Sequence, residues 1–207
     1  MTSRRRQGKS LKRSVGQRPE LRTIVVFTEG KNSEPDYVNG LRRLPHIAEN
    51  IALNIEIHPE HGVPLTLVQL AAERKKDSEI DECWCIFDVE WPKHHPNLNE
   101  AFSLAQKKGV NLAVSNPCFE VWLILHLKEH SRFSDTNSAE SLSRSLDKRA
   151  GKSIEAATYM PQRRIAAKRA KKLAMRHERD GTRFPNDNPS SGMYAFLYAL
   201  EGEEDAR

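Results

Sequence analysis

The sequence predicts an α/β fold with a mostly parallel sheet flanked by helices. The order of the elements along the chain supports this prediction. Apolar, strand-like runs alternate with helix-like segments from residue 22 to about residue 128, an order that is typical of a parallel sheet covered on both faces. Right-handed crossovers between parallel strands then restrict the topology to a few choices. The length of 207 residues suits one domain of ordinary size with a small appendage.

Four strands are expected in the first part of the chain. The second alternates apolar and polar residues, whereas the other three are short apolar runs. These strands are residues 22–28, 51–57, 82–88 and 110–115.

A helix is expected after each of these strands. Ser33 can cap the first helix, with Asp36 three residues on, and Pro64 suits the first turn of the second. Gly109 ends the third helix, and Pro117 lies just before the fourth. These helices are residues 33–43, 64–76, 97–107 and 119–128.

No strand is expected after about residue 131. Residues 131–138 and 182–191 are polar or rich in proline and are predicted as loops. Short helical pieces are expected after residue 138, followed by a basic helix at residues 161–180, and an apolar helix at residues 193–200 closes the chain. The basic helix can pack inward through Ile165, Ala166, Ala170, Leu173 and Ala174.

Charge is segregated along the chain. Residues 1–20 carry seven Lys or Arg against one Glu and show no apolar periodicity, so this tail is expected to be disordered. Residues 161–180 carry eight Lys or Arg against two acids. Since the net charge of the whole chain is +5, the rest is acidic, which suits a protein that binds a polyanion beside a cation. We therefore divide the chain into a basic tail (1–20), an α/β domain (21–130) and a helical extension packed on it (131–207).

Composition argues against a membrane protein and against a disulfide-rich one. No apolar run reaches the roughly 20 residues needed to cross a bilayer, and the basic first residues lack the apolar stretch of a secretion signal. Cys83, Cys85 and Cys118 are too few and too embedded in apolar segments for a disulfide framework. We expect a reduced, cytoplasmic protein.

Acidic residues stand where the first and third expected strands end. Glu29 ends the first strand and is followed by Gly30, which permits a tight turn; Asp88 and Glu90 end the third. The carboxyl ends of parallel strands meet at one edge of a sheet, and side chains at i and i+2 of a strand point the same way. Carboxylates gathered there repel one another unless a cation or a shared proton holds them. This edge is therefore predicted as a Mg²⁺ site, with solvated carboxylates at strand ends as the alternative.

Four motifs resemble those of the RloB family, and the placement of the acids resembles the Toprim domain. They are Val-Phe-Thr-Glu-Gly-Lys-Asn-Ser-Glu-Pro-Asp-Tyr at 26–37, Phe-Asp-Val-Glu at 87–90, Ser-Asn-Pro-Cys-Phe-Glu-Val-Trp-Leu-Ile-Leu-His at 115–126, and Asn-Pro-Ser-Ser at 188–191. The region of resemblance extends from residue 24 to about residue 200.

The resemblance implies a Toprim-like fold and a nuclease that depends on Mg²⁺ or Mn²⁺. In Toprim enzymes the first Glu is the general acid or base and an Asp-x-Asp pair holds the metal. This assigns proton transfer to Glu29 and the metal to Asp88 and Glu90, although Glu90 departs from the pattern by one methylene. RloB-like proteins also resemble the nuclease half of phage-defence pairs, which implies a role in abortive infection and an ATPase partner encoded alongside.

Further residues of the motifs have both a functional and a structural interpretation. Glu34 and Glu120 stand in first turns of helices, where the helix dipole favours any acid; Glu34 is a catalytic candidate and Glu120 a metal-ligand candidate. Lys31 could contact a phosphate, or it could offset the charges of Glu29 and Glu34.

In the third motif, Asn116 and His126 could complete the site. His126 could equally be a hydrogen-bonded core residue, and Trp122 and Leu125 are predicted in the core. A zinc site is disfavoured because neither the two cysteines around Trp84 nor the histidines have a recognised spacing. The histidines weighed are His58, His61, His94 and His95.

The basic helix is the candidate nucleic-acid surface, with a solvated charged face as the alternative. No aromatic residues interleave its cations, so stacking on single-stranded bases is not indicated. The candidate contacts are Arg163, Arg164, Lys168, Arg169, Lys172 and Arg176.

We thus expect a metal-dependent nuclease acting on DNA or RNA, with oligomers possible. Two alternatives remain open. One is a nucleic-acid-binding subunit with a degenerate site, and the other is a regulatory partner that acts on an ATPase by protein contact.

Overall fold

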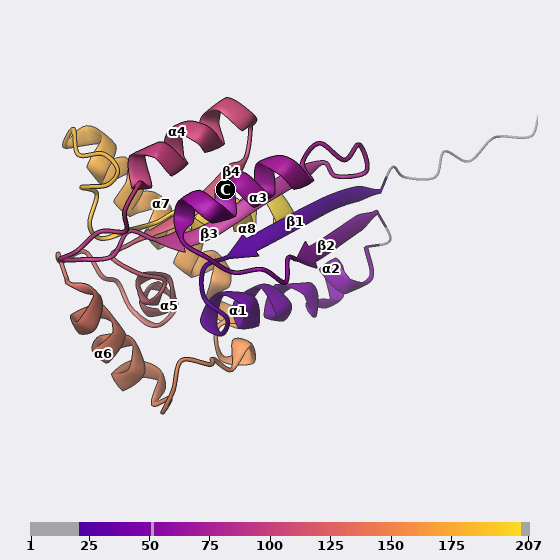
Figure 1. The fold of residues 1–207 in the computed structure, drawn as a ribbon. Helices are drawn as coiled ribbons and strands as arrows, with labels where there is room; N and C mark the ends of the chain where they lie inside the picture. Colours follow the sequence, from indigo (N-terminus) through magenta and orange to yellow (C-terminus); the bar gives the residue numbers. More distant parts are fainter. Residues whose placement is uncertain (1–20, 51, 204–207) are drawn as a thin grey trace, which may run out of the picture.

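The computed structural model describes residues 21–50 and 52–203. Within them, five strands form one sheet in the order β2-β1-β3-β4-β5, with helices on both faces (Figure 1). Strands β1 to β4 are parallel, and β5 runs antiparallel to β4. The predicted α/β class and the mostly parallel sheet are confirmed. The predicted tail at residues 1–20 lies outside the described residues.

The first four strands lie close to where they were predicted. β2 begins later than expected because the Leu53 amide still bonds the Asn50 carbonyl in a turn, at 3.0 Å. The bounds are β1 Arg22–Thr28, β2 Leu53–Ile57, β3 Glu82–Asp88, β4 Asn111–Asn116 and β5 Ser190–Ser191.

Strand β5 corrects the prediction that no strand follows residue 131 and that residues 182–191 are all loop. Ser191 pairs with Ser115, and their hydroxyl oxygens lie 2.9 Å apart. The next amide, that of Gly192, donates to the Val114 carbonyl at 2.7 Å. A Cβ on Gly192 would stand 3.0 Å from the Val114 nitrogen, so the close approach favours glycine. A two-residue strand of serines carries no periodicity that a sequence pattern could reveal.

The helices that were predicted after each strand are all present. Ser33 does not cap the first one: it is the first helical residue, and its hydroxyl donates to the Lys152 carbonyl at 2.6 Å. The short helix α2 was not predicted. The short helical pieces expected before the basic helix are present as α6, η1 and η2, but α6 already begins at Thr136, inside the segment 131–138 that was predicted as a loop. The bounds are α1 Ser33–Arg42, α2 Pro45–Ala48, α3 Pro64–Arg74, α4 Leu98–Lys108, α5 Glu120–Leu127, α6 Thr136–Asp147, η1 Ala156–Thr158, η2 Met160–Gln162, α7 Arg163–Arg179 and α8 Met193–Glu201.

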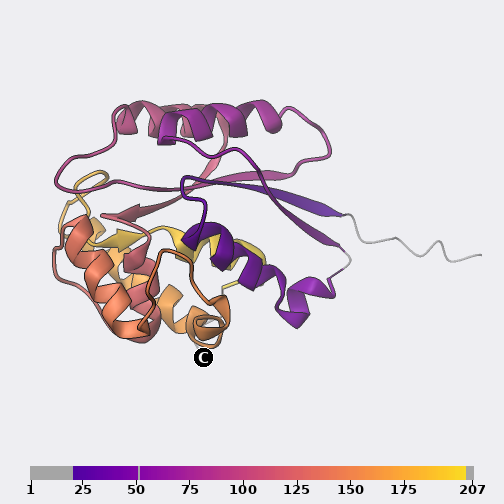
Figure 2. The same cartoon turned by 60° about the horizontal axis from the view of Figure 1, so that its bottom comes forward.

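Helices cover the sheet in two layers (Figure 2). On one face, α3 and α4 pack against Val25 and Phe27 of β1 and their neighbours. On the other face, α1, α5, α7 and α8 enclose a second core that contains Ile24 and Val26. Because alternate residues of β1 are buried on opposite faces, the central strands are continuous apolar runs, as expected for a parallel sheet covered on both sides.

Helix α7 buries a stripe that agrees only in part with the prediction. Ala166, Ala170 and Leu173 are buried as expected, but Ile165 is 45% exposed and Ala174 is half-buried. Ala167 and His177 are buried without having been predicted. Ala166, Ala170 and Leu173 follow the spacing i, i+4, i+7, and Ile165 lies off this line.

Among the described residues, none of the helices combines the length and the apolar character that crossing a bilayer requires.

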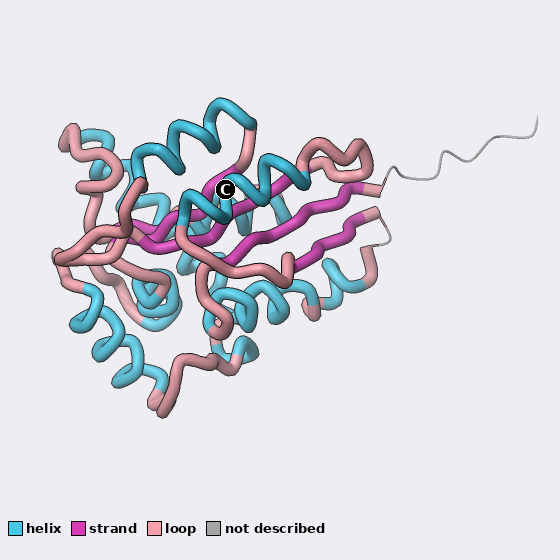
Figure 3. The backbone as a smooth tube through the Cα atoms, viewed as in Figure 1, coloured by secondary structure: helices cyan, strands magenta, loops and turns pink. Residues whose placement is uncertain are grey.

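The carboxyl ends of the parallel strands meet at one edge of the sheet. Figure 3 shows the loops that leave β1, β3 and β4 at this edge, beside the beginnings of α1 and α5. Every acidic residue singled out in the sequence is on one of these segments.

Candidate active site

Five carboxylates converge at this edge. Glu29 follows β1, Asp88 ends β3, Glu90 comes two residues later, Glu34 is in the first turn of α1, and Glu120 is the first residue of α5. The pKa of the Asp88 carboxyl lies well above its usual value, first because of burial and then because of the charges of the other four. The predicted acids from distant parts of the chain are therefore close enough to affect one another.

Glu29 lies directly against the end of β3. Its Oε2 accepts a hydrogen bond from the Asp88 amide at 3.0 Å, and its Oε1 lies 2.6 Å from Nε2 of His95. The contact with Glu29 raises the pKa of His95, so a protonated imidazole is favoured there. The sequence analysis weighed His95 only as a zinc ligand, and its position in a loop after β3 was the one available signal for this role.

Asp88 has a buried carboxylate oxygen, Oδ1, that lacks a hydrogen-bond donor among the described residues. A buried acceptor without a partner costs about 1–3 kcal/mol, and more when it is charged. This oxygen therefore needs a proton, a water molecule or a cation.

Glu34 is 6% exposed, and its Oε1 accepts the Gly30 amide at 3.0 Å. A Cβ on Gly30 would stand 2.5 Å from Oε2 of Glu34, so this turn requires glycine unless the carboxylate moves. Burial raises the pKa of Glu34, and the charges of Glu29 and Glu120 add to the effect.

Glu90 reaches the site by a different route from the one predicted. It adopts a left-handed conformation with φ of 66° after β3 has ended, so the alternation of a strand does not orient its side chain. Instead its Oε2 accepts a hydrogen bond from the hydroxyl of Thr136, the first residue of α6, at 2.8 Å. The same hydroxyl accepts the Trp91 amide at 3.0 Å. Glu90 is thus positioned by α6.

Glu120 is 9% exposed and faces an arginine that the sequence analysis missed. Nη2 of Arg149, in the loop after α6, lies 3.3 Å from Oε1 of Glu120. Nη1 of Arg149 also donates to the Ser143 hydroxyl at 2.9 Å and bonds Asp147. No sequence pattern links Arg149 to Glu120, because the contact depends on how the loop folds back over α5.

The structure separates the remaining predicted residues. Lys31 is exposed in the turn after Glu29. Asn116 is buried, and its Nδ2 donates to the Pro185 carbonyl at 2.9 Å and to Asp187 at 3.0 Å, which fastens the loop before β5.

His126 is a core residue near the end of α5. Its Nδ1 lies 2.8 Å from the Trp122 carbonyl and its Nε2 lies 3.0 Å from the Tyr37 hydroxyl. Burial lowers its pKa to about 4, so His126 is neutral and serves packing. Trp122 and Leu125 are buried as predicted.

The donor chemistry of the acidic cluster fits a hard divalent cation, because its ligand atoms are carboxylate oxygens. In residues 21–50 and 52–203, no group of three His, Cys, Asp or Glu side chains is placed to hold an ion by itself. The site therefore fits a Mg²⁺-type ion held by one or two carboxylates, with water and substrate oxygens as its other ligands. It does not fit a closed protein cage.

The cations of the predicted nucleic-acid surface fall into two groups. At the start of α7, Arg163 and Arg164 bond the two oxygens of Glu201, at 2.7 and 3.0 Å. Further along the helix, Lys168, Arg169, Lys172 and Arg176 line a groove on the outward face.

The matching family model agrees with the motifs. The model of the RloB-like protein family matches residues 24–200, which is most of the chain. The chain therefore belongs to the RloB-like family. No match was found among curated proteins or among solved structures.

Proposed function

We propose that this protein is a metal-dependent phosphodiesterase with a Toprim-like centre, acting as a nuclease. The observation that carries the proposal is Oδ1 of Asp88, a buried acceptor without a described partner among four further carboxylates. A divalent cation would satisfy this oxygen and offset the mutual repulsion of the acids.

One or two of the carboxylates of Asp88, Glu90 and Glu120 would hold the ion, with water and substrate oxygens as its other ligands. When bound, a divalent ion polarises a phosphoryl oxygen and lowers the pKa of a water molecule. Glu90 is oriented for this role by Thr136, and Glu120 by Arg149. Lys31, which is exposed in the turn after Glu29, would contact a phosphate oxygen of the substrate.

Glu29 would carry the proton. Its carboxylate is held by the Asp88 amide on one side and by His95 on the other. Held in this way, the Glu29 carboxylate would accept a proton from the attacking water. Glu34, fixed against Gly30, maintains the turn that presents Glu29.

Hydrolysis of a small activated diester, bis(4-nitrophenyl) phosphate, with and without Mg²⁺ or Mn²⁺ tests the proposal independently of any nucleic-acid contact. Glu29→Gln and Asp88→Asn are expected to lower the rate at least 100-fold. Glu73→Gln is the matched control, since Glu73 is a 73% exposed acid on α3. Wild-type rates in both site variants would overturn the assignment. A wild-type protein that binds nucleic acid but never hydrolyses the diester would favour the degenerate binding subunit instead.

We also propose that the protein works with an ATPase in phage defence. This part rests on the resemblance to RloB-like proteins that the sequence motifs carry, which implies such a pairing, and membership of the family supports it. Co-expression with the ATPase encoded alongside, followed by size-exclusion chromatography after nuclease treatment, tests it. A stable complex is expected, and separate elution at micromolar concentrations would contradict the proposal.

A further inference from the structure

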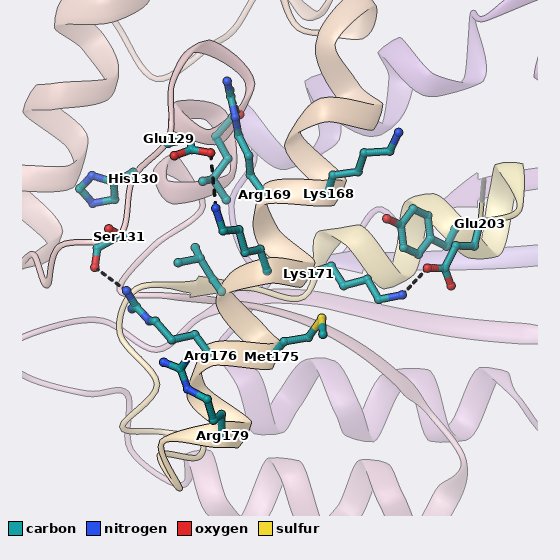
Figure 4. Close-up of a pocket in the computed structure, with 14 residues that line it drawn as sticks. Glu129, His130, Ser131, Lys168, Arg169, Lys171, Met175, Arg176, Arg179 and Glu203 are labelled. Atoms are coloured by element: carbon teal, nitrogen blue, oxygen red, sulfur yellow. Dashed lines mark hydrogen bonds and ion pairs between the residues drawn. The ribbon is translucent and has the colours of Figure 1, made fainter. Parts of the chain in front are cut away.

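A basic groove runs along the outward face of α7, away from the acidic cluster. It has a volume of about 1380 Å³ and lies between the loop at residues 129–131 and helix α8. Figure 4 shows Arg169, Arg176 and Arg179 on the side of α7 toward that loop, and Lys171 reaching toward Glu203 after α8. The groove has six cations against two acids, Glu129 and Glu203; the cations are Lys168, Arg169, Lys171, Lys172, Arg176 and Arg179.

Four of the cations form a line along the helix. Lys168, Lys172, Arg176 and Arg179 follow the spacing i, i+4, i+8, i+11, so they recur about every 4.5–6 Å along one face at the helical rise of about 1.5 Å per residue. A nucleic-acid strand carries a charge roughly every 3.4 Å along its axis. The line therefore matches a regularly charged backbone, about one cation for every two phosphates.

Two members of the line are open to solvent and loosely held. The side chains of Lys172 and Arg179 are 79% and 74% exposed. Lys172 lies 3.8 Å from Glu129, itself 73% exposed, and an exposed pair of this kind contributes little. Arg179 is paired with the neighbouring Asp180, at 2.9 Å, in a position that is also exposed. Phosphate oxygens can therefore replace the carboxylates of Glu129 and Asp180 at small cost.

Other cations of α7 have structural duties instead. Arg163 and Arg164 are tied to Glu201, whose side chain is 1% exposed. Nη1 of Arg169 donates to the Leu125 carbonyl at 2.7 Å and so satisfies the last turn of α5. Only some of the cations of α7 are thus available to an external polyanion, because Arg163, Arg164 and Arg169 are bonded to other parts of the protein.

Helix α5 relates the groove to the acidic cluster. Glu120 is its first residue, whereas Leu125, near its end, lines the groove. At about 1.5 Å per residue, the five steps from Glu120 to Leu125 rise about 7.5 Å along the helix. None of the five carboxylates lines the groove, so the groove is separate from the place where a phosphate would be cleaved.

We infer that this groove binds the sugar–phosphate backbone of a polynucleotide outside the hydrolytic centre, so that the substrate is a long polymer rather than a nucleotide or a short oligomer. This inference rests on the proposed nuclease function. The binding is independent of base sequence, because the contacts are cations and the groove's lining offers no row of rings for stacking, only those of His130 and Tyr198. An acidic protein segment would match the same charges, but the regular spacing of the cations along the helix favours a regularly charged polymer.

The test compares two double variants with the same change in charge. Lys172→Glu/Arg179→Glu alters the groove, and Lys107→Glu/Lys108→Glu alters exposed residues at the end of α4, on the other face of the sheet. Binding of a fluorescent polynucleotide of 40 nucleotides is measured by fluorescence anisotropy in EDTA over a series of NaCl concentrations. We expect the groove variant to bind about 10-fold or more weakly, with a log–log salt slope smaller by about 2. The control should change by less than threefold, and thermal melting should show both variants folded.

Equal weakening in both variants would show general charge attraction and would overturn the groove assignment, as would wild-type binding in the groove variant. If the groove variant bound fluorescent polyglutamate more weakly than the wild type does, but bound the polynucleotide equally well, the groove would be assigned to an acidic protein segment. Since these assays contain no metal and involve no cleavage, they fail or succeed separately from the diester hydrolysis that tests the catalytic proposal.

Discussion

At the scale of single residues, the acidic cluster is a set of carboxylates that are each restrained by a different donor. Glu29 has His95 and the Asp88 amide, Glu90 has Thr136, and Glu120 has Arg149. Oδ1 of Asp88 stands out because the described residues offer it no donor. The cluster is therefore least stable at Asp88 when no cation is present.

Replacing Asp88 with Asn tests this strain directly. The substitution puts a neutral amide in place of a carboxyl whose pKa is raised by burial and by the charges of the neighbouring acids. In EDTA, Asp88→Asn is expected to raise the melting temperature by about 2–4 °C, which corresponds to about 1 kcal/mol. Mg²⁺ should raise the melting temperature of the wild type, because a ligand that binds the native state stabilises it, and should not raise that of the variant.

The Glu73→Gln control should retain the response to Mg²⁺. A wild-type melting temperature that is insensitive to millimolar Mg²⁺ would contradict the metal assignment.

His126 predicts how stability depends on pH. Its pKa is about 4 in the native protein, below the ordinary value of 6.5. Between these values the unfolded chain binds a proton that the native protein does not bind, so the free energy of unfolding falls as the pH drops from 6.5 toward 4. The loss can reach about 3 kcal/mol.

Urea unfolding of the wild type and of His126→Gln across this pH range measures the effect. The variant should be less stable at pH 7, because it loses the contacts to Trp122 and Tyr37, and its stability should depend less on pH. Parallel curves for the two proteins would refute this role of His126.

At the scale of elements, the position of Glu34 depends on how α1 packs against the segment after α6. The Ile154 amide donates to Oδ2 of Asp36 at 3.1 Å, and Ser33 bonds the Lys152 carbonyl. Gly40 lets α1 approach η1, since a Cβ there would stand 2.4 Å from Cβ of Ala156. The end of the sheet that carries the site is thus braced by residues far away in sequence.

Gly40→Ala is expected to destabilise the protein by about 1–3 kcal/mol, because the added methyl overpacks this contact. Alanine has the better helix propensity, which by itself would stabilise the variant by about 1 kcal/mol. We expect the overpacking to outweigh this gain. Gly151→Ala is the matched control, as nothing lies within 4 Å of an added Cβ there. Chemical denaturation of both variants measures the difference, and a Gly40→Ala protein as stable as the wild type would show that α1 can shift freely.

At the scale of the whole molecule, both faces of the sheet are sealed, and all three cysteines lie inside. Burial raises the pKa of Cys83 to about 11 and raises the pKa values of Cys85 and Cys118 as well. Because the thiolate is the reactive form, none of these thiols should react readily in the native protein.

Labelling with a maleimide at pH 7.5, followed by intact mass spectrometry, is expected to leave the native protein unmodified on the timescale that labels the unfolded chain completely. The labelling rate should rise with guanidinium concentration in parallel with the loss of circular dichroism. Rapid modification of one thiol without denaturant would reveal local opening near that cysteine.

Much of the fold and part of the site were accessible from the sequence. Alternation of apolar runs with helical segments predicted the parallel sheet, and in such a sheet Glu29 and Asp88 must meet because the strands β1 and β3 end at the same edge. The turn glycine Gly30 was recognisable for the same local reason. These features depend on short-range patterns and on a general rule of α/β topology.

Other features were decided only by the tertiary structure. The partners His95 and Arg149 are supplied by irregular loops, and Glu90 is oriented by a hydroxyl from α6 rather than by the alternation of a strand. Strand β5 exists because a two-residue segment far along the chain finds the free edge of β4.

The basic helix shows the same division. Its charge and its buried stripe were visible in the sequence, but which cations bond Glu201 and which line the groove depends on where α8 and the end of α5 lie. Periodicity reports which side of an element is buried, whereas the pairing of side chains from distant elements depends on loop geometry, which no local pattern encodes.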